Sequence, residues 1–194
     1  MRILVSTVAG ALCLAVFSVG QVSAVPSPTP SATDKTVRIV GEEKFSPDEF
    51  FTVTYRFGPR RIRVRQGGTI TWDNQTNDGH SVSVVTREQL PRTVQDVNNC
   101  NVCNDLLAAH FPNGFPPQGA PVLVLDDFKA TTAPARFDSS GDSAIVAPPG
   151  VPGPTRVSVV ISAAPGSTLD YLCAIHPWMQ GSIQVVARGD NTDD

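Results

Sequence analysis

Stretches in which apolar and polar residues alternate dominate the chain from residue 36 onward. The pattern runs through residues 36–40, 51–57, 61–65, 69–72 and 80–85, and it returns in residues 156–161, 167–172 and 181–186. A period of two residues puts successive side chains on opposite faces of a strand. Each stretch is therefore predicted to be a β-strand. Short strands separated by turn signals, such as Gly67-Gly68, are typical of a β-sandwich or a β-barrel.

One predicted strand has a strongly charged face. Residues 61–65 read RIRVR, which places the arginines on one side and Ile62 and Val64 on the other. We interpret the arginines as the solvated face of an edge strand, where charge discourages aggregation. The alternative is a basic stripe that attracts an acidic redox partner.

The middle of the chain, about residues 86–140, interrupts this pattern. It contains a short helix candidate at residues 105–109 and one further strand candidate at residues 121–125. We interpret the segment as a long irregular insertion within one domain that spans residues 36–187. Because loops longer than about 15 residues are usually functional or disordered, its length calls for an explanation.

The N-terminal end of the chain predicts export. Residues 1–24 combine Arg2, an apolar stretch and the small-residue sequence Val22-Ser23-Ala24, which is typical of a cleaved signal peptide; the alternative is an uncleaved membrane anchor. Residues 25–35 form a Pro/Ser/Thr-rich leader, and residues 188–194 form an acidic tail. We therefore expect a periplasmic or extracellular protein with no stable membrane insertion after removal of the signal.

The cysteine count singles out one thiol. Removal of the signal peptide removes Cys13 and leaves Cys100, Cys103 and Cys173. In an exported protein an odd cysteine is either free or in use. For Cys100 and Cys103 we favour a small disulfide over a redox pair or half of a zinc site. Cys173 is then the unpaired cysteine.

A possible metal-binding loop begins at this cysteine. Cys173, His176 and Met179 lie within seven residues between two predicted strands, and Pro177 argues against a helix there. A tight loop can turn the thiolate, imidazole and thioether toward one point. A trigonal set of two His and one Cys with a weak axial Met is the ligand set of blue-copper electron-transfer sites. The alternative is that each residue is an ordinary structural residue.

A second histidine must come from outside the loop. The chain has three, and His80 opens a predicted strand directly after the turn-prone residues 77–79. His110 lies in an apolar neighbourhood, which favours a packing role over a second metal site. His80 is therefore the candidate that completes the set with Cys173 and His176.

These motifs resemble the cupredoxins. The sequence C-x-x-H-x-x-M, with Pro after the His, is similar to the amicyanin loop, and residues 68–80 (Gly-x-Ile-x-Trp-x-Asn, then His) are similar to the approach to the family's first histidine ligand. The resemblance implies a Greek-key β-sandwich that binds one type 1 copper ion. His80, Cys173 and His176 would be the strong ligands and Met179 the weak axial ligand.

Two features depart from the family pattern. Ser81 stands where the family usually has Asn, a residue that braces the loop near the cysteine sulfur, so the hydrogen bonds around that sulfur and the potential they set are in question. The gap between His80 and Cys173 is also much longer than is usual in the family, because it contains the insertion.

The resemblance implies a protein that carries single electrons between redox partner proteins. The alternative is a copper-handling protein, a chaperone or scavenger, with the same metal site. Multicopper enzymes need further histidines, so we do not expect an enzyme. The formal net charge of -3 argues against nucleic-acid binding, and we expect a monomer.

Overall fold

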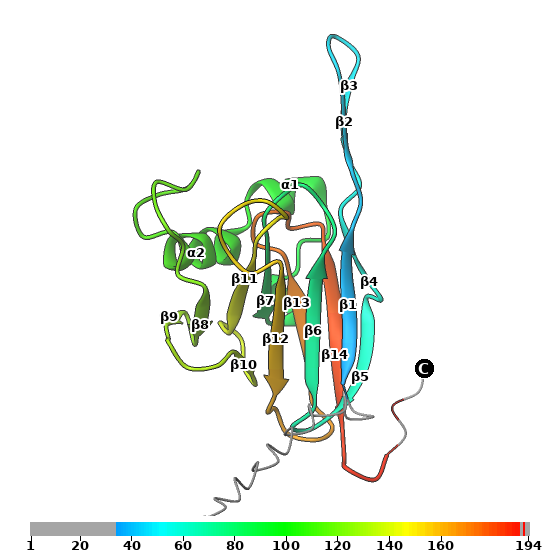
Figure 1. Ribbon diagram of the computed structural model, residues 1–194. Helices are drawn as coiled ribbons and strands as arrows, with labels where there is room; N and C mark the ends of the chain where they lie inside the picture. Colours follow the sequence, from blue (N-terminus) through cyan, green and yellow to red (C-terminus); the bar gives the residue numbers. More distant parts are fainter. Residues whose placement is uncertain (1–33, 191, 193–194) are drawn as a thin grey trace, which may run out of the picture.

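Two β-sheets packed face to face form the body of the protein (Figure 1). The computed structural model describes residues 34–190 and 192. The expected signal peptide and nearly all of the expected leader lie outside the described residues. None of the helices in residues 34–190 is long and apolar enough to cross a membrane.

The first sheet has five strands in the order β10-β12-β6-β1-β4. These strands span Arg136–Phe137, Arg156–Ile161, Thr69–Asn74, Lys35–Val40 and Arg56–Gly58. β1 pairs in parallel with β6 and antiparallel with β4. The alternating pattern of β6 is reflected in its burial, because Ile70, Trp72 and Asn74 point inward.

The second sheet has seven strands in the order β5-β14-β13-β7-β11-β8-β9. These strands span Arg61–Arg65, Gln180–Val186, Thr168–Leu172, His80–Val85, Ser143–Val146, Val124–Asp126 and Lys129–Ala130. β5 lies at the edge of the sheet with Ile62 and Val64 buried, which confirms the interpretation of its arginines as the outer face of an edge strand. The chain crosses repeatedly between the two sheets, so the predicted all-β sandwich is confirmed.

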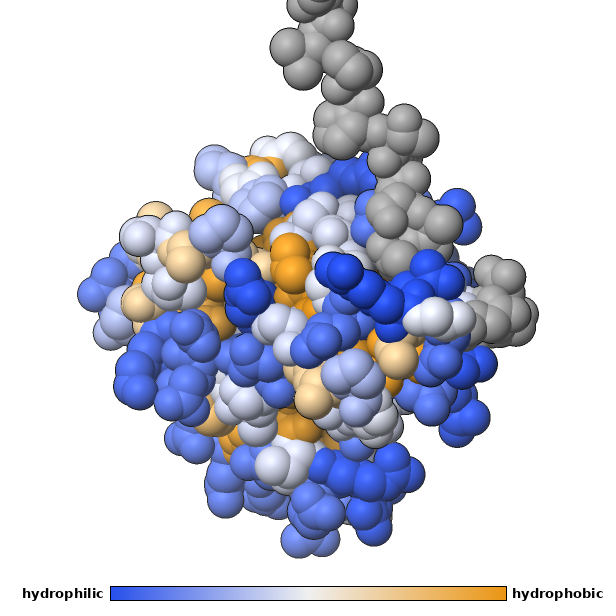
Figure 2. All heavy atoms as spheres, turned by 90° about the horizontal axis from the view of Figure 1, so that it is seen from below, coloured by the Kyte–Doolittle hydropathy of each residue, from blue (hydrophilic) through white to orange (hydrophobic). Residues whose placement is uncertain are grey.

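Large apolar side chains fill the space between the sheets. Trp72, Tyr171, Phe57 and Phe137 are all fully buried there, and their rings contact one another in tilted or edge-to-face arrangements. Gly181 makes room for this packing, because a side chain at that position would collide with the Tyr171 ring. Seen from below, the surface of the body shows small apolar areas between hydrophilic residues (Figure 2).

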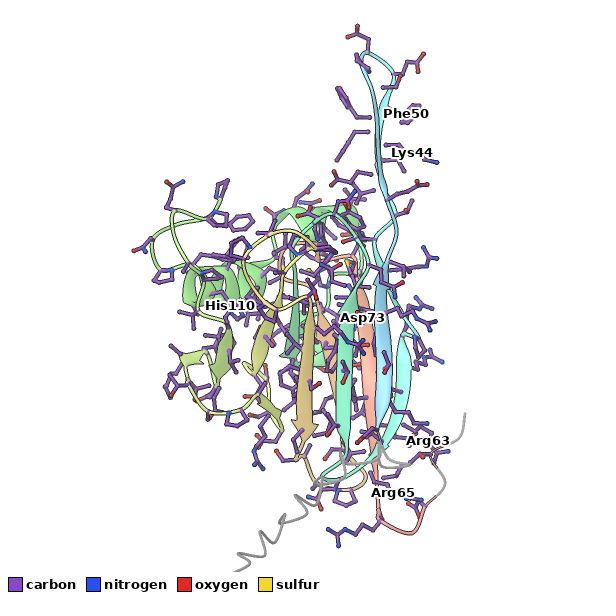
Figure 3. All side chains as sticks on the ribbon, viewed as in Figure 1. Lys44, Phe50, Arg63, Arg65, Asp73 and His110 are labelled. Carbon is purple, nitrogen blue, oxygen red and sulfur yellow. A yellow bond between two sulfur atoms is a disulfide. The ribbon has the colours of Figure 1, made fainter. Side chains whose placement is uncertain are left out.

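The single strand predicted over residues 51–57 is wrong. The residues belong to two strands, β3 (Phe50–Val53) and β4, separated by Thr54 and Tyr55. β3 pairs only with β2 (Glu43–Ser46), and the two form an arm that projects beyond the body (Figures 1 and 3). The strand breaks because Tyr55 turns inward and is buried, while the phenylalanines of the arm stay exposed.

The insertion is more regular than its sequence suggests. It contains the 3₁₀ turn η1 (Arg87–Gln89), the helices α1 (Val94–Asn98) and α2 (Asn101–His110), and the strands β8, β9 and β10. α2 begins four residues before the predicted helix, because Cys100 caps its first turn and forms a disulfide with Cys103. Leu106 of α2 packs against Leu125 and Leu172 in a second apolar cluster. The insertion therefore adds strands to both sheets and a helix to one face.

Candidate metal centre

Three side chains with metal-binding atoms meet in the interior at one end of the sandwich. His80 is the first residue of β7, Cys173 directly follows β13, and His176 lies in the loop between β13 and β14. The Cys173 Sγ lies 3.8 Å from the Nδ1 of each histidine, and the two Nδ1 atoms lie 3.3 Å apart. All three residues are buried. The structure thus brings together three of the four residues expected as ligands.

The spacing of these atoms suits a single first-row metal ion. An ion about 2.3 Å from sulfur and about 2.0 Å from each nitrogen, at the centre of a triangle, would separate sulfur from nitrogen by about 3.7 Å and the nitrogens by about 3.5 Å. The observed separations of 3.8, 3.8 and 3.3 Å are close to these values. The mixture of thiolate and imidazole favours copper over magnesium or calcium, which prefer oxygen ligands.

Backbone hydrogen bonds close the loop that carries the fourth expected ligand. The Cys173 N–H donates to the Met179 carbonyl at 3.0 Å, and the Met179 N–H donates to the His176 carbonyl at 2.8 Å. Met179 is buried and belongs to the same apolar cluster as Cys173. The loop is therefore compact. An axial role for the Met179 thioether stays a prediction.

Hydrogen bonds fix the orientation of the His80 ring. The His80 Nε2 lies 2.7 Å from the Thr76 hydroxyl, which in turn donates to the Asn74 side-chain oxygen at 2.9 Å. With the Thr76 proton used in this way, the His80 Nε2–H donates to Thr76, and the lone pair of Nδ1 faces the other ligand atoms. Partners of this kind set the tautomer of metal-binding histidines.

The His176 ring is held from its outer side. Its Nε2 lies 3.3 Å from the Asp78 carboxylate, so Nδ1 points toward His80 and Cys173. The Tyr55 ring packs edge-on against both histidines with ring centres 5.1 Å away. Trp178 packs against His176 and is 43% exposed. His176 is thus the expected ligand that contacts an exposed side chain of the loop.

Burial opposes charge on the ligand side chains of the metal-free protein. Burial, and to a smaller extent the neighbouring His176, lower the pKa of His80 to about 3. Burial raises the pKa of the Cys173 thiol to about 11, although backbone N–H groups of Ser81, His176 and Ile175 favour its thiolate. The histidines are therefore neutral at pH 7 and available as ligands. A bound cation would supply the charge that lets the thiol lose its proton.

Ser81 takes part in bracing the sulfur. Its backbone N–H donates to the Cys173 Sγ at 3.3 Å. Its hydroxyl accepts a hydrogen bond from the Ala174 N–H at 2.8 Å. Serine thus ties β7 to the loop with a shorter side chain than asparagine.

Sequence reasoning missed three residues that surround the ligands. Thr76, Asp78 and Tyr55 position the two histidine rings, yet none of them belongs to a metal-ligand pattern. The only signal was indirect, because Asp78 lies in the turn-prone run before His80 and Tyr55 interrupts an alternating stretch. His110, in contrast, lies away from the ligands in a packed position, as predicted.

We expect the metal-free protein to lose stability as the pH falls below about 6.5, partly through His110. Burial lowers the pKa of His110 to about 4, below its unfolded value of 6.5. The stabilisation is thus present above the unfolded pKa and is lost as the pH falls through the folded pKa. The contribution of this residue is about 3 kcal/mol at most. Denaturant unfolding between pH 7.5 and pH 4 measures it, and His110→Gln should flatten the profile. Equal slopes in both proteins would contradict the prediction.

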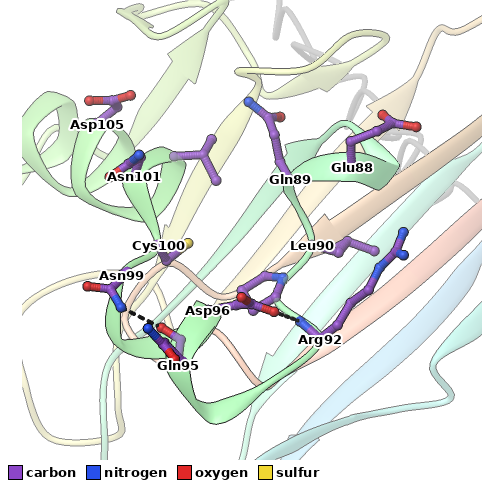
Figure 4. Close-up of a pocket in the computed structure, with 12 residues that line it drawn as sticks. Glu88, Gln89, Leu90, Arg92, Gln95, Asp96, Asn99, Cys100, Asn101 and Asp105 are labelled. Atoms are coloured by element: carbon purple, nitrogen blue, oxygen red, sulfur yellow. Dashed lines mark hydrogen bonds between the residues drawn. The ribbon is translucent and has the colours of Figure 1, made fainter.

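A surface hollow in the insertion does not belong to this site. It has a volume of about 800 Å³ and is lined by residues of the insertion around η1, α1 and α2 (Figure 4). Its wall is held by hydrogen bonds from the Arg92 N–H to Asp96 and from the Asn99 amide to the Gln95 carbonyl. None of the four expected ligands lines it.

Comparisons with known proteins give distant structural likenesses. No protein-family model and no curated protein matches the chain. Among solved structures, a purple cupredoxin from Nitrosopumilus maritimus matches 77% of this chain and 97% of its own at 13% identity (TM-score 0.38). Reduced auracyanin from Roseiflexus castenholzii matches 80% of this chain and 98% of its own at 16% identity (TM-score 0.43). A multicopper oxidase matches 81% of this chain and 39% of its own at 14% identity (TM-score 0.34).

Likenesses this distant assign no role to the chain. Its fold follows from its own strands, which form two packed sheets with the cysteine loop between β13 and β14 at one end. This is the all-β sandwich that the sequence predicts.

Proposed function

We propose that the protein binds one type 1 copper ion through His80, Cys173, His176 and Met179 and carries single electrons. The observation that supports this most strongly is the buried triangle of one sulfur and two nitrogen atoms. Copper bound there would supply a Cu(I)/Cu(II) couple. The chain's part is to hold the ligands in one arrangement for both oxidation states.

The rigidity of the site favours electron transfer over copper handling. His80 is held by Thr76, His176 by Asp78, and the loop by hydrogen bonds between the backbones of Cys173 and Met179. A site that changes little between oxidation states has a small reorganisation barrier, whereas a chaperone must open to release its ion. A copper-handling role is the second candidate, supported by the same ligand set.

The partners would be redox proteins that dock near His176. The exposed Trp178 packs against this ring, which links the buried ligands to the surface. We further propose a periplasmic or extracellular location, a monomer and no enzymatic activity. The last point is supported by the three histidines of the whole chain, which are too few for additional copper centres.

The visible absorption spectrum of the Cu(II)-loaded protein tests the proposal. We expect an intense thiolate-to-copper band that ascorbate bleaches reversibly. Cys173→Ala should abolish the band because it removes the sulfur ligand. The double variant Cys100→Ser, Cys103→Ser removes the other two cysteine sulfurs of the described residues and should keep the band. A pale wild-type spectrum, or failure to retain copper, would refute the ligand assignment.

A further inference from the structure

A row of buried polar side chains connects the metal-binding loop to the insertion. Ser81 and Ser83 lie on β7, and Ser143 lies on the neighbouring strand β11. His110 is the last residue of α2 (Figure 3). The three serines and His110 are all fully buried. β7 and β11 pair with Ser143 opposite Ser83, which places the two hydroxyls side by side.

Short hydrogen bonds join these side chains without a gap. Ser81 Oγ lies 2.9 Å from Ser83 Oγ, and Ser83 Oγ lies 2.6 Å from Ser143 Oγ. Ser143 Oγ lies 2.7 Å from the His110 Nε2. At the other end, Ser81 Oγ accepts the Ala174 N–H at 2.8 Å, directly beside Cys173.

The direction of every hydrogen bond in this row follows from one carbonyl. The His110 Nδ1 lies 2.6 Å from the Val122 carbonyl oxygen, which can only accept, so Nδ1 carries the proton. Burial lowers the pKa of His110 to about 4, which keeps the ring neutral at pH 7. The Nε2 must then accept the Ser143 proton. Ser83 donates in turn to Ser143, and Ser81 donates to Ser83.

The row therefore determines where the Ser81 proton points. The Ser81 hydroxyl faces the Cys173 sulfur as well as Ser83. The Ser81 hydroxyl lies close enough to the sulfur to favour its thiolate, but while Ser83 accepts the Ser81 proton, that proton is not directed at the sulfur. Hydrogen bonds to the cysteine sulfur are among the features that set the potential of a blue-copper site.

We propose that His110 is a positioning residue that acts through Ser143, Ser83 and Ser81 to keep the Ser81 hydroxyl from donating to the Cys173 sulfur. The expected consequence is a lowered reduction potential of the copper site, and this consequence rests on the proposed function. It also gives the insertion a role, because His110 and Val122 both belong to that segment. The effect reaches the metal centre through hydroxyl groups and needs no direct contact.

Interrupting the row gives the first test. In Ser143→Ala the Ser83 hydroxyl loses its acceptor and turns to donate to Ser81, whose proton is then free for the sulfur. We expect the Cu(I)-to-Cu(II) ratio at a fixed ambient potential to rise at least threefold, about 28 mV for one electron. The thiolate-to-copper band should move to shorter wavelength. Ser83→Ala should act in the same direction, and His110→Gln, which keeps an acceptor for Ser143, should resemble the wild type.

A double-mutant cycle shows whether the effect passes through Ser81. In Ser81→Ala the hydroxyl is absent, so adding Ser143→Ala should shift neither the ratio nor the band. A shift that persists in the double variant would overturn the proposal, as would an unshifted Ser143→Ala. Ser158→Ala is a matched control, because it breaks a surface hydroxyl pair of similar length, 2.8 Å to Thr71, outside the row.

A measurement on the metal-free protein separates this proposal from the proposed function. Nitrogen NMR of the imidazoles should show the Nδ1–H tautomer for His110, and the Ala174 amide signal should move in Ser143→Ala. A His110 Nε2–H tautomer, or an Ala174 signal that does not respond, would refute the relay whatever the copper spectrum shows. A wild type without the thiolate band but with both NMR signatures would refute the proposed function alone.

Discussion

Loading the protein with one copper ion is expected to raise its free energy of unfolding by about 4 kcal/mol when free copper exceeds the Kd about 1,000-fold. The reason is that the folded sheets bring His80 and Cys173 within 3.8 Å of each other, although the sequence separates them widely. The unfolded chain offers no such preformed site. Denaturant unfolding of the metal-free and the Cu(I)-loaded protein under anaerobic conditions measures the difference.

The ligand variants give this experiment its controls. Cys173→Ala should remove most of the stabilisation by copper, while Trp178→Ala, an exposed neighbour of His176, should keep it. The stabilisation should also decline with falling pH, because protons compete with the ion for sulfur and imidazole. Coincident unfolding curves with and without copper would contradict the proposed metal site. His80, Cys173 and His176 would then lie together only because of side-chain packing.

Trp72→Ala is expected to destabilise the protein by about 4 kcal/mol, since removal of a buried Trp leaves a cavity that the core fills only in part. Trp72 is fully buried and contacts the rings of Phe137 and Tyr171 between the two sheets. For a domain of this size the change corresponds to a lowering of the Tm by about 12 °C. Chemical denaturation of the metal-free protein, followed by circular dichroism, measures the effect.

The chain contains a matched control for this substitution. Trp178 is the second tryptophan, and it lies partly exposed on the loop. Its replacement by Ala should change the stability by less than about 0.5 kcal/mol, as for most surface positions. Similar losses in the two variants would show that burial between the sheets is not what makes Trp72 important.

The sequence predicted the strands of the sandwich well, because their burial depends on local alternation. Residues 61–65 show this clearly, with Ile62 and Val64 inward on an edge strand. The arm was not predicted, because the alternation in residues 51–57 continues from β3 into β4 and gives no sign of the break between them. β11 was missed as well, since four buried residues (SAIV) carry no period that distinguishes them from a loop.

The candidate site, too, could be predicted only in part from the sequence. Cys173, His176 and Met179 are recognisable because one loop holds all three, and His80 because few histidines compete with it. Their supporting residues could not be predicted, since Thr76 and Asp78 act through a turn whose geometry appears only in the fold. The row from Ser81 to His110 depends on the pairing of β7 with β11, which joins residues far apart in sequence.

The pairing of β14 with β5 has a consequence for the order of events during biosynthesis. β5 joins the second sheet only through β14, in parallel register, and β14 is the last strand of the chain. Until residue 186 has been synthesised, the second sheet therefore cannot be complete. Long-range pairings of this kind also form slowly. β5 is therefore made early but has no partner in the second sheet until nearly all of the described residues have been synthesised.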